Sequence, residues 1–191
     1  MSQRFRPARQ GKDDPLRSLR LLAVLAAGAL AVALSMVFAG GRIMAGFGRG
    51  DAPALQGKPV VVDGDSLTLG ARRIRLLHVD ACEIGQPATR GGDTFDCGGW
   101  ARAAMAALIG DSRLACENHG LDRYGRVLAH CSTGDGVNIA LAAVRAGIAF
   151  VGDPRRAPKA FTEAEHQARA RGLGVWGFSV ERPDAYRRRS A

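Results

Sequence analysis

Apolar positions divide this chain into one long uninterrupted stretch near the N-terminus and a series of short runs after it. The stretch Leu21–Gly41 contains no charged residue. About 20 apolar residues, each rising ~1.5 Å, can cross a hydrocarbon core of about 30 Å, so we predict a transmembrane helix over 21–41. Residues 42–57 are rich in Gly, Ala and Pro without clear periodicity, and we predict a linker there.

Basic residues dominate the segment before this stretch, which we predict to be a basic cytoplasmic tail over 1–20. The positive-inside rule then sends the rest of the chain to the periplasmic or extracellular side of the membrane. The alternative is a cleaved signal peptide with a cleavage site at Val37–Ala39, which would give a secreted protein. The apolar core of a signal peptide is usually shorter, about 7–15 residues, so we favour an uncleaved signal-anchor.

Short apolar runs separated by turn residues follow the linker and indicate β-strands. Residues 80–98 are rich in Gly and polar residues and predict a long loop, which in a compact domain is often functional. The predicted strands are Pro59–Val62, Ser66–Leu69, Arg72–Val79, Arg113–Cys116 and Arg126–Cys131.

Three segments with helical spacing alternate with these strands: Trp100–Ile109, Asn138–Ala146 and Thr162–Arg171. Gly147 would end the second helix as a C-cap glycine, and Thr162 would cap the start of the third. Short strands in this number, with helices at their side, predict an α+β domain built on a small closed or partly open barrel.

The formal net charge is +9, but it is spread unevenly. The segment before Gly57 has 8 basic and 3 acidic residues, and the segment from Gly57 onward has 19 and 15. The soluble part is therefore only mildly basic, which fits a polyanionic partner without requiring one. Arg187–Arg189 lie in a basic tail over 181–191 that we expect to be solvated and disordered, or to bind nucleic acid or membrane phosphate weakly.

Four cysteines all follow the apolar stretch: Cys82, Cys97, Cys116 and Cys131. An even number in an exported domain suggests two disulfides, although four free thiols remain possible and a zinc site is disfavoured by the absence of CxxC spacing. Cys116 and Cys131 lie on two apolar runs joined by a polar turn, so we pair them, and Cys82 with Cys97 by elimination.

Charged residues concentrate in three clusters: Asp63–Ser66, Arg75–Glu83 and Asp122–Arg126. Alternation along a strand would place Arg75 on the face of Leu77 and Val79, where burial is costly without an anionic partner. Carboxylates at strand ends make an oxygen site that suits Ca²⁺ or Mg²⁺, and nearby arginines suit phosphate. Each cluster alone has an ordinary interpretation as a turn or a surface ion pair.

The order and spacing of the three clusters resemble the staphylococcal nuclease (thermonuclease) family. The matching segments are Val61–Ser66, Arg75–Glu83 and Asp122–Arg126, and the resemblance extends over roughly Pro59–Gly177. It implies an OB-fold, five-stranded β-barrel with three helices over 58–180, and Ca²⁺-dependent hydrolysis of DNA and/or RNA by a protein we expect to be a monomer.

The resemblance also implies roles for individual residues. Arg75 and Arg126 would bind the scissile phosphate and stabilise its extra charge in the transition state, and Glu83 would orient or deprotonate the attacking water. The implied metal ligands are Asp65, Asp80 and the carbonyl of Ala81, and the residues expected at a flanking phosphate or base are Arg123 and Tyr124.

The sequence departs from the family pattern in three places. Ala81 replaces a threonine, and Cys82 replaces a proline, which loosens the backbone unless a disulfide to Cys97 restrains it. Phe150–Asp153 occupies the region of a substrate-contacting tyrosine pair. The alternative function is a non-catalytic OB-fold module that binds nucleic acid or another polyanion. A glutamate beside the phosphate has no purpose in mere binding, so Glu83 favours the enzyme.

Overall fold

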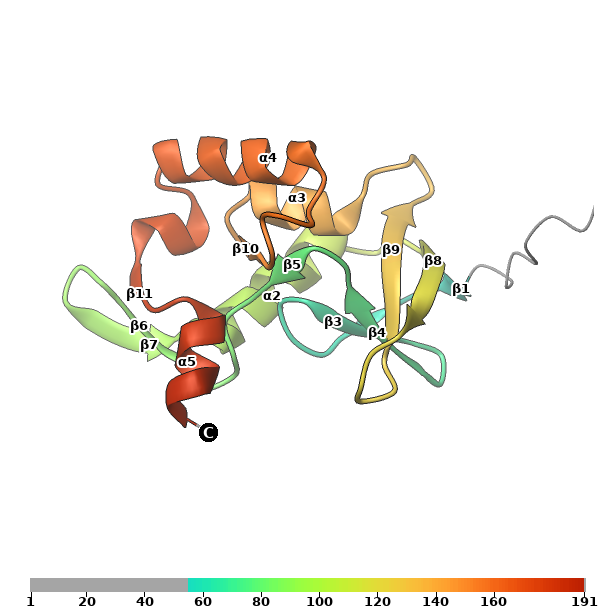
Figure 1. Ribbon diagram of the computed structural model, residues 1–191, viewed down its shortest axis with the longest axis horizontal. Coiled ribbons are helices and arrows are strands. Elements are labelled where there is room, and N and C mark those ends of the chain that lie inside the picture. Colours follow the sequence, from blue (N-terminus) through green and yellow to red (C-terminus); the bar gives the residue numbers. More distant parts are fainter. Residues whose placement is uncertain (1–54, 191) are drawn as a thin grey trace, which may run out of the picture. The chain divides into compact units, whose positions relative to one another are not determined.

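The computed structural model describes residues 55–190, which form three β-sheets and four α-helices (Figure 1). The predicted transmembrane helix, most of the predicted linker and the basic tail at 1–20 lie outside these residues. No helix within 55–190 is long and apolar enough to span a membrane.

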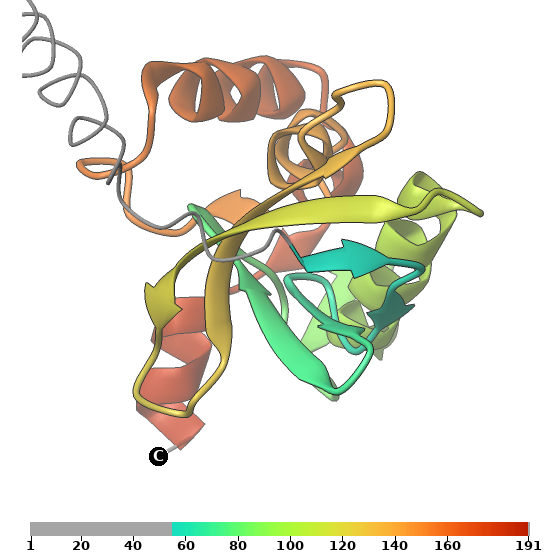
Figure 2. The same cartoon turned by 90° about the vertical axis from the view of Figure 1, so that its right-hand side faces the viewer.

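The largest sheet has six strands in the order β1-β8-β9-β4-β3-β2. Neighbouring strands are antiparallel, except that β4 pairs with β9 in parallel. Figure 2 shows the long, curved β8–β9 hairpin crossing the domain. The strands are β1 (Leu55–Gly57), β2 (Val60–Val61), β3 (Ser66–Leu69), β4 (Arg72–Leu76), β8 (Leu114–Leu121) and β9 (Val127–Thr133).

Two small sheets complete the strand structure. One pairs β5 (Val79–Asp80) with β10 (Phe150–Val151). In the other, β6 lies between β7 and β11. The strands of that last sheet are β6 (Pro87–Arg90), β7 (Asp93–Asp96) and β11 (Ser179–Val180).

The predicted α+β class is confirmed, but two details of the expected architecture are wrong. Strands β1 and β2 are the edges of the six-stranded sheet, so among the described residues the sheet does not close into a five-stranded barrel. A fourth α-helix is present in addition to the three expected. The helices are α2 (Cys97–Ile109), α3 (Ile139–Arg145), α4 (Lys159–Ala170) and α5 (Pro183–Ser190), with a short 3₁₀ helix η2 (Gly174–Gly177).

The main core lies between the large sheet and α2, α3 and α4. Alternate residues of the strands point into it, such as Leu67, Ile74 and Leu76, and α2 contributes Met105. A second, smaller cluster joins the β6 sheet to η2 and contains Phe150 and the Cys82–Cys97 pair. Trp176 packs against this smaller cluster, and its ring lies edge-on to Phe150 at 5.1 Å between ring centroids.

Helix boundaries follow their capping residues. Asn138 caps α3, because its side-chain oxygen accepts a hydrogen bond from the Leu141 N–H at 2.9 Å, so the helix predicted from Asn138 begins one residue later. Helix α2 begins before the predicted Trp100, because Asp96 accepts from the Gly99 N–H at 3.0 Å and so caps an earlier first turn. Helix α4 begins at Lys159 after Pro158, so the expectation that Thr162 caps it is wrong.

Strand and loop predictions need four corrections. The strand expected over 72–79 ends at Leu76, because His78 has φ 69° and turns the chain. The loop expected over 80–98 contains the β6–β7 hairpin, and the strand expected over 113–116 extends to Leu121. The segment expected to be a disordered tail forms α5, which packs through the buried Pro183.

Candidate active site

A cavity of about 440 Å³ collects residues from all three charged clusters of the sequence. It contains every residue predicted to be catalytic or substrate-binding, together with Asp65 and Ala81. Asp80 lies behind the wall and reaches the site through its ion pairs with Arg75 and Arg187. The lining residues are Asp63, Asp65, Arg73, Arg75, Ala81, Cys82, Glu83, Arg123, Tyr124, Arg126 and Arg187.

Asp65 enters the site from a tight turn between β2 and β3. Its backbone N–H donates to Asp63 at 2.9 Å, which fixes the turn. The next residue back must be glycine, because a Cβ on Gly64 would lie 2.5 Å from the Cβ of Ala81 and 2.9 Å from that of Ala101. The buried Asp65 carboxylate accepts a hydrogen bond from the Ala81 N–H at 2.9 Å and forms an ion pair with Arg75.

Arg75, near the end of β4, joins Asp65 to Asp80. Its Nη2 atom donates to the carbonyl of Val79 at 3.1 Å and to the Asp80 carboxylate at 3.2 Å. Burial lowers the pKa of Arg75, although Asp80 acts in the opposite direction. The arginine that sequence alternation placed on an apolar face is therefore paired with two carboxylates, as the cost of burying an isolated charge requires.

Glu83 stands on a loop that is held at several points. Its backbone N–H donates to the side chain of the buried Gln86 at 3.0 Å, and the Gln86 N–H donates back to the Glu83 carbonyl at 2.9 Å. Gly98 packs so closely on that carbonyl that a Cβ there has no room. The Cys82–Cys97 disulfide closes the same loop. The Glu83 carboxylate itself remains 42% exposed and faces the cavity.

Arg126 comes from the β8–β9 turn. Its Nε atom pairs with Asp122 at 2.7 Å, and its Nη1 atom donates to the Ser66 hydroxyl at 3.3 Å, next to Asp65. Burial acts to raise the pKa of Asp122, but its hydrogen bonds from the backbone and side chain of Arg126 outweigh burial and lower it. Asp122 therefore remains a carboxylate that orients Arg126.

Arg123 and Tyr124 form an exposed rim beside Arg126. The Tyr124 ring is 64% exposed, and the guanidinium carbon of Arg123 lies 4.8 Å from its centroid. The guanidinium of Arg126 lies 5.6 Å from the same ring. These cation–π contacts hold an aromatic face open to solvent at the edge of the cavity.

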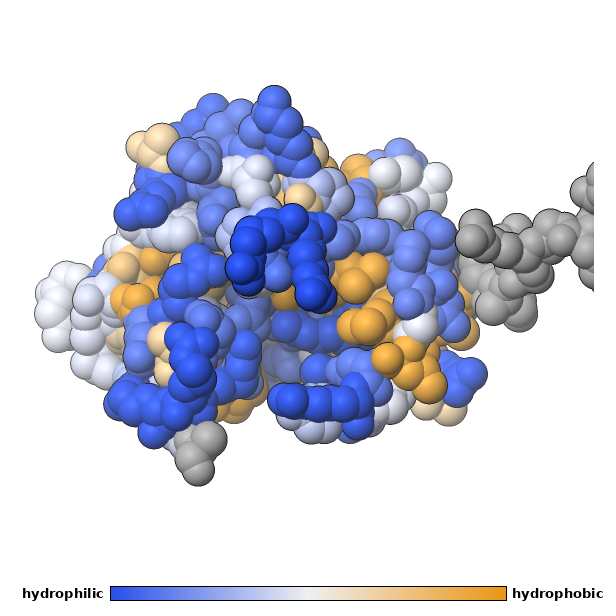
Figure 3. Space-filling view, in the orientation of Figure 1, coloured by the Kyte–Doolittle hydropathy of each residue, from blue (hydrophilic) through white to orange (hydrophobic). Residues whose placement is uncertain are grey.

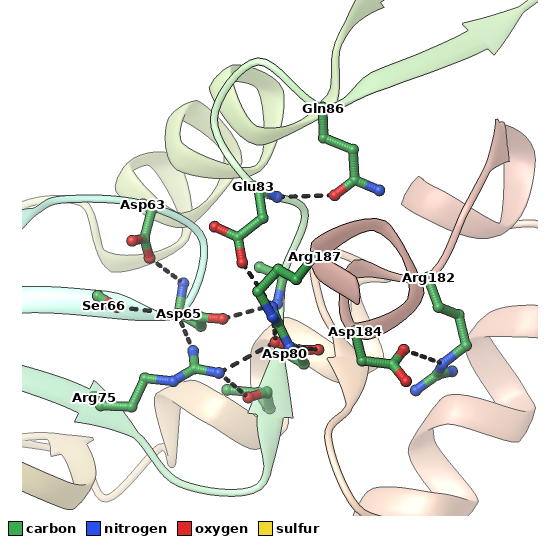
Figure 4. A network of polar contacts seen from close by, with 12 residues as sticks. Asp63, Asp65, Ser66, Arg75, Asp80, Glu83, Gln86, Arg182, Asp184 and Arg187 are labelled. Carbon is green, nitrogen blue, oxygen red and sulfur yellow. Dashed lines mark hydrogen bonds and ion pairs between the residues drawn. The ribbon is translucent and has the colours of Figure 1, made fainter. Parts of the chain in front are cut away.

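Arg187 is a site residue that sequence reasoning missed. It projects from α5 and binds the Asp80 carboxylate through two parallel contacts, Nη1 to Oδ1 and Nη2 to Oδ2, each 3.0 Å long (Figure 4). Its Nη1 atom also donates to Glu83 at 2.6 Å. Three consecutive arginines at a polar C-terminus contain no signal that distinguishes this one, because its position depends on where α5 docks.

The donors at this site suit a hard cation in type. Asp65 and Asp80 are buried carboxylates that share Arg75 as an ion-pair partner, and Arg187 links Asp80 to Glu83, so the available side-chain ligands are oxygens. Two guanidinium groups, those of Arg75 and Arg187, neutralise these carboxylates. Within residues 55–190 no group of three or more acidic, histidine or cysteine side chains is arranged around a single metal position.

The two disulfides have the pairing predicted from the sequence. Cys82 bonds to Cys97, and Cys116 bonds to Cys131. The second pair lies directly opposite in the antiparallel register of β8 and β9, with 4.0 Å between Cα atoms. Within 55–190 there is no free cysteine, so neither free thiols nor a zinc–thiolate site exists there.

The fold and the site define this protein as an α+β domain in which carboxylates and arginines surround one cavity. The family described as "Staphylococcal nuclease homologue" matches residues 73–177. The chain is 32% identical to the succinoglycan biosynthesis protein ExoI of Rhizobium meliloti (strain 1021) over 141 residues, which cover 72% of this chain and 73% of the relative. It is 31% identical to an uncharacterized endonuclease of Escherichia coli over 120 residues, or 61% and 72% of the two chains.

This chain therefore belongs to the staphylococcal nuclease homologue family, as its three motifs predict. An uncharacterized endonuclease from Escherichia coli O157:H7 has the same degree of similarity, 31% over 120 residues.

Proposed function

We propose that this protein is a Ca²⁺-dependent nuclease that hydrolyses phosphodiester bonds of DNA or RNA outside the cytoplasm. The observation that carries the proposal is that Arg75, Glu83 and Arg126, from three separate segments, line a single cavity with Asp65 and Ala81. Family membership and the two relatives named as endonucleases support it.

Arg75 and Arg126 are the phosphate-binding groups in this proposal. A phosphodiester gains negative charge in the transition state of hydrolysis, and guanidinium groups can donate two parallel hydrogen bonds to its oxygens. Asp122 and Ser66 orient Arg126, while Asp65 and Asp80 orient Arg75. Because both arginines are held by partners before substrate arrives, little reorganisation is required during the reaction.

Glu83 is the proposed group that positions and activates the attacking water. Its carboxylate is exposed to the cavity while its backbone is fixed by Gln86, so it can accept a hydrogen bond from a water molecule close to a bound phosphate. In this position it orients the water for in-line attack and accepts its proton.

Asp65, Asp80 and the carbonyl of Ala81 are the proposed Ca²⁺ ligands. The ion would supply positive charge that polarises the phosphate and lowers the pKa of bound water. The Asp65 side chain is kept near Ala81 by the hydrogen bond between them, and Gly64 permits the close approach.

The exposed rim of Arg123 and Tyr124 is the proposed contact for a flanking nucleotide. An aromatic ring 64% exposed beside two guanidinium groups can stack on a base of any identity and contact its neighbouring phosphate. We propose that the protein acts as a monomer on such a substrate.

The proposed location outside the cytoplasm rests on the apolar stretch 21–41 and is supported by the two disulfides, since disulfides persist in oxidising compartments. Expression in a bacterium, followed by protease treatment of spheroplasts, tests it. We expect the domain to be degraded without detergent. Protection of the domain would contradict the proposed location outside the cytoplasm.

A cleavage assay with the full-length protein tests the proposed activity. Labelled single-stranded DNA and RNA are incubated with Ca²⁺ or with chelator, using the wild type and the Arg75→Ala and Arg123→Ala variants. We expect Ca²⁺-dependent cleavage by the wild type, loss of cleavage in Arg75→Ala, and weaker binding in Arg123→Ala. Binding without cleavage by all three proteins would instead support the non-catalytic module.

A further inference from the structure

Arg187 lies outside the three family motifs, and α5 is the element that brings it to the site. The start of α5 is attached to the rest of the domain by specific contacts. The side chain of Gln86 donates to the carbonyl of Glu181 at 2.8 Å, and Arg182 donates to the carbonyl of Val151 at 2.7 Å. Arg182 also lies over the Phe150 ring at 4.8 Å.

These contacts connect α5 to both sides of the site. Gln86 is the residue that holds the backbone of Glu83, and Val151 belongs to β10, which pairs with β5 and hence with Asp80. The docking of α5 and the position of the two acidic side chains are therefore mechanically linked. Figure 1 shows α5 beside the segment that joins β5 to β6.

The guanidinium of Arg187 lies between the carboxylates of Asp80 and Glu83 (Figure 4). Asp80 is 7% exposed and receives both Nη atoms of Arg187, the paired geometry in which arginine binds carboxylates most strongly. Hydrogen bonding to Asp80, with a further bond to Glu83, raises the pKa of Arg187. An arginine side chain is always charged in proteins, so Arg187 is a permanent positive charge.

We propose that Arg187 is a built-in competitor of the divalent cation: it neutralises Asp80 and Glu83 in the metal-free protein, and a cation gains Asp80 only by displacing it. This inference rests on the proposed function only in assigning Asp80 as a metal ligand. The contacts that α5 makes through Gln86 and Arg182 do not involve Arg187, so the guanidinium can leave while the helix stays docked.

Arg187 also affects substrate binding in this proposal. Asp80 and Glu83 repel a phosphate when unneutralised, and Arg187 removes this repulsion before metal arrives. Strongly hydrophilic residues lie at the position of α5, although hydrophobic residues are exposed elsewhere on the same face, so a displaced Arg187 side chain returns to water at little cost (Figure 3). Its present side-chain exposure of 45% supports this view.

Calorimetric titration of Ca²⁺ into the full-length protein tests the proposal independently of catalysis. Four proteins are compared: the wild type, Arg187→Ala, Arg187→Lys and Arg188→Ala. Arg188 is the matched control, because it lies on the same helix, removes the same charge, and contacts Asp184 rather than the site. Lysine at 187 keeps the charge but cannot bind Asp80 through two parallel bonds.

We expect Arg187→Ala to bind Ca²⁺ about tenfold more tightly than the wild type, which corresponds to about 1.4 kcal/mol. Arg188→Ala should stay within about twofold of the wild type, and Arg187→Lys should fall between them. Melting curves give a second readout. Arg187→Ala should melt at a lower temperature than Arg188→Ala in chelator, and Ca²⁺ should raise its melting temperature by more.

Equal Ca²⁺ affinities for Arg187→Ala and Arg188→Ala would overturn the proposal, as would the absence of Ca²⁺ binding in all four proteins. The role of Arg187 and the nuclease activity are tested separately. A wild type that cleaves with Ca²⁺ while the variants bind the ion equally would contradict only the role of Arg187. A tenfold gain in affinity without cleavage would uphold that role and contradict the nuclease.

Discussion

The carboxylate of Asp65 accepts a hydrogen bond from the backbone N–H of Ala81 at 2.9 Å, although Asp65 lies in the turn before β3 and Ala81 lies directly after β5. This bond ties the turn after β2 to the segment after β5, and the ion pair from Asp65 to Arg75 ties both to β4. Two of the three segments that carry the family's motifs, Val61–Ser66 and Arg75–Glu83, are thus joined at one buried carboxylate.

Replacing Asp65 by alanine should therefore reduce stability as well as Ca²⁺ affinity. The change leaves the Ala81 N–H unpaired and removes one of the two carboxylates that neutralise the buried Arg75. We expect the free energy of unfolding to fall by about 2–3 kcal/mol, measured by urea denaturation in chelator. Asp63→Ala, which removes only a turn hydrogen bond to Asp65, is the comparison and should cost about 1 kcal/mol. Similar losses for both variants would contradict this account.

Gly98→Ala should damage the site through the backbone of Glu83. A Cβ at this position meets the Glu83 carbonyl, so the glutamate must move or α2 must shift. We expect loss of cleavage with substrate affinity largely kept, because Arg75 and Arg126 stand on other elements. Gly134→Ala is the control, since a Cβ there meets nothing within 4 Å. If Gly98→Ala cleaves as fast as Gly134→Ala, the position of Glu83 is not decisive.

The parts of this fold that the sequence predicts are those determined locally. The strand–turn at Val61–Ser66, the extent of helix α3 and the cysteine pairing all follow from residues close in the chain or directly opposite on a hairpin. The β6–β7 hairpin was missed because its strands carry few apolar residues. Its turn residues, Gly91 and Gly92, both have positive φ and fit a two-residue hairpin loop.

The site was predicted as a set of residues but not as a complete network. Asp65, Arg75, Glu83 and Arg126 come together because the sheet order brings β3, β4 and β9 side by side. The position of Arg187 depends on contacts between segments far apart in the chain, such as Gln86 with Glu181. No local pattern contains that information, so the triple arginine resembled an ordinary solvated tail.

The two disulfides should contribute differently to stability and activity. Each closes a loop of sequence separation 15, and a loop of that length restricts the unfolded chain by about 3 kcal/mol. We expect Cys116→Ser with Cys131→Ser, and Cys82→Ser with Cys97→Ser, to lower the melting temperature to a similar degree. Only the second pair should also lower the cleavage rate of the folded protein, because it closes the loop that carries Glu83. Unchanged melting in reductant would contradict a structural role for either bond.

Stability should fall as the pH drops below about 6.5, because of a histidine cluster formed by His119 on β8, His130 on β9 and His78. The ring of His130 lies 5.1 Å from that of His78 and 4.7 Å from that of His119. Burial, followed by repulsion from neighbouring histidines, lowers the pKa of His130, and burial lowers that of His78. The unfolded chain then binds more protons, so acid favours unfolding.

Melting temperatures measured from about pH 7 to about pH 5 check this expectation. The drop in melting temperature should be smaller in His130→Gln than in the wild type. His166→Gln, at an exposed position on α4, should keep the drop of the wild type. A melting temperature of the wild type that does not change with pH, or equal drops in melting temperature in all three proteins, would show that protonation of the cluster does not destabilise the fold.

Single-turnover cleavage by the wild type and Glu83→Gln tests the central claim most directly. Labelled single-stranded DNA is bound to excess full-length protein in saturating Ca²⁺, and its affinity is measured on the same samples by fluorescence anisotropy. Glutamine has the shape of the glutamate but cannot accept the proton of water, so we expect cleavage to slow by about 100-fold or more while affinity changes less than about threefold. Equal cleavage rates for the two proteins, or no cleavage by the wild type, would contradict the account.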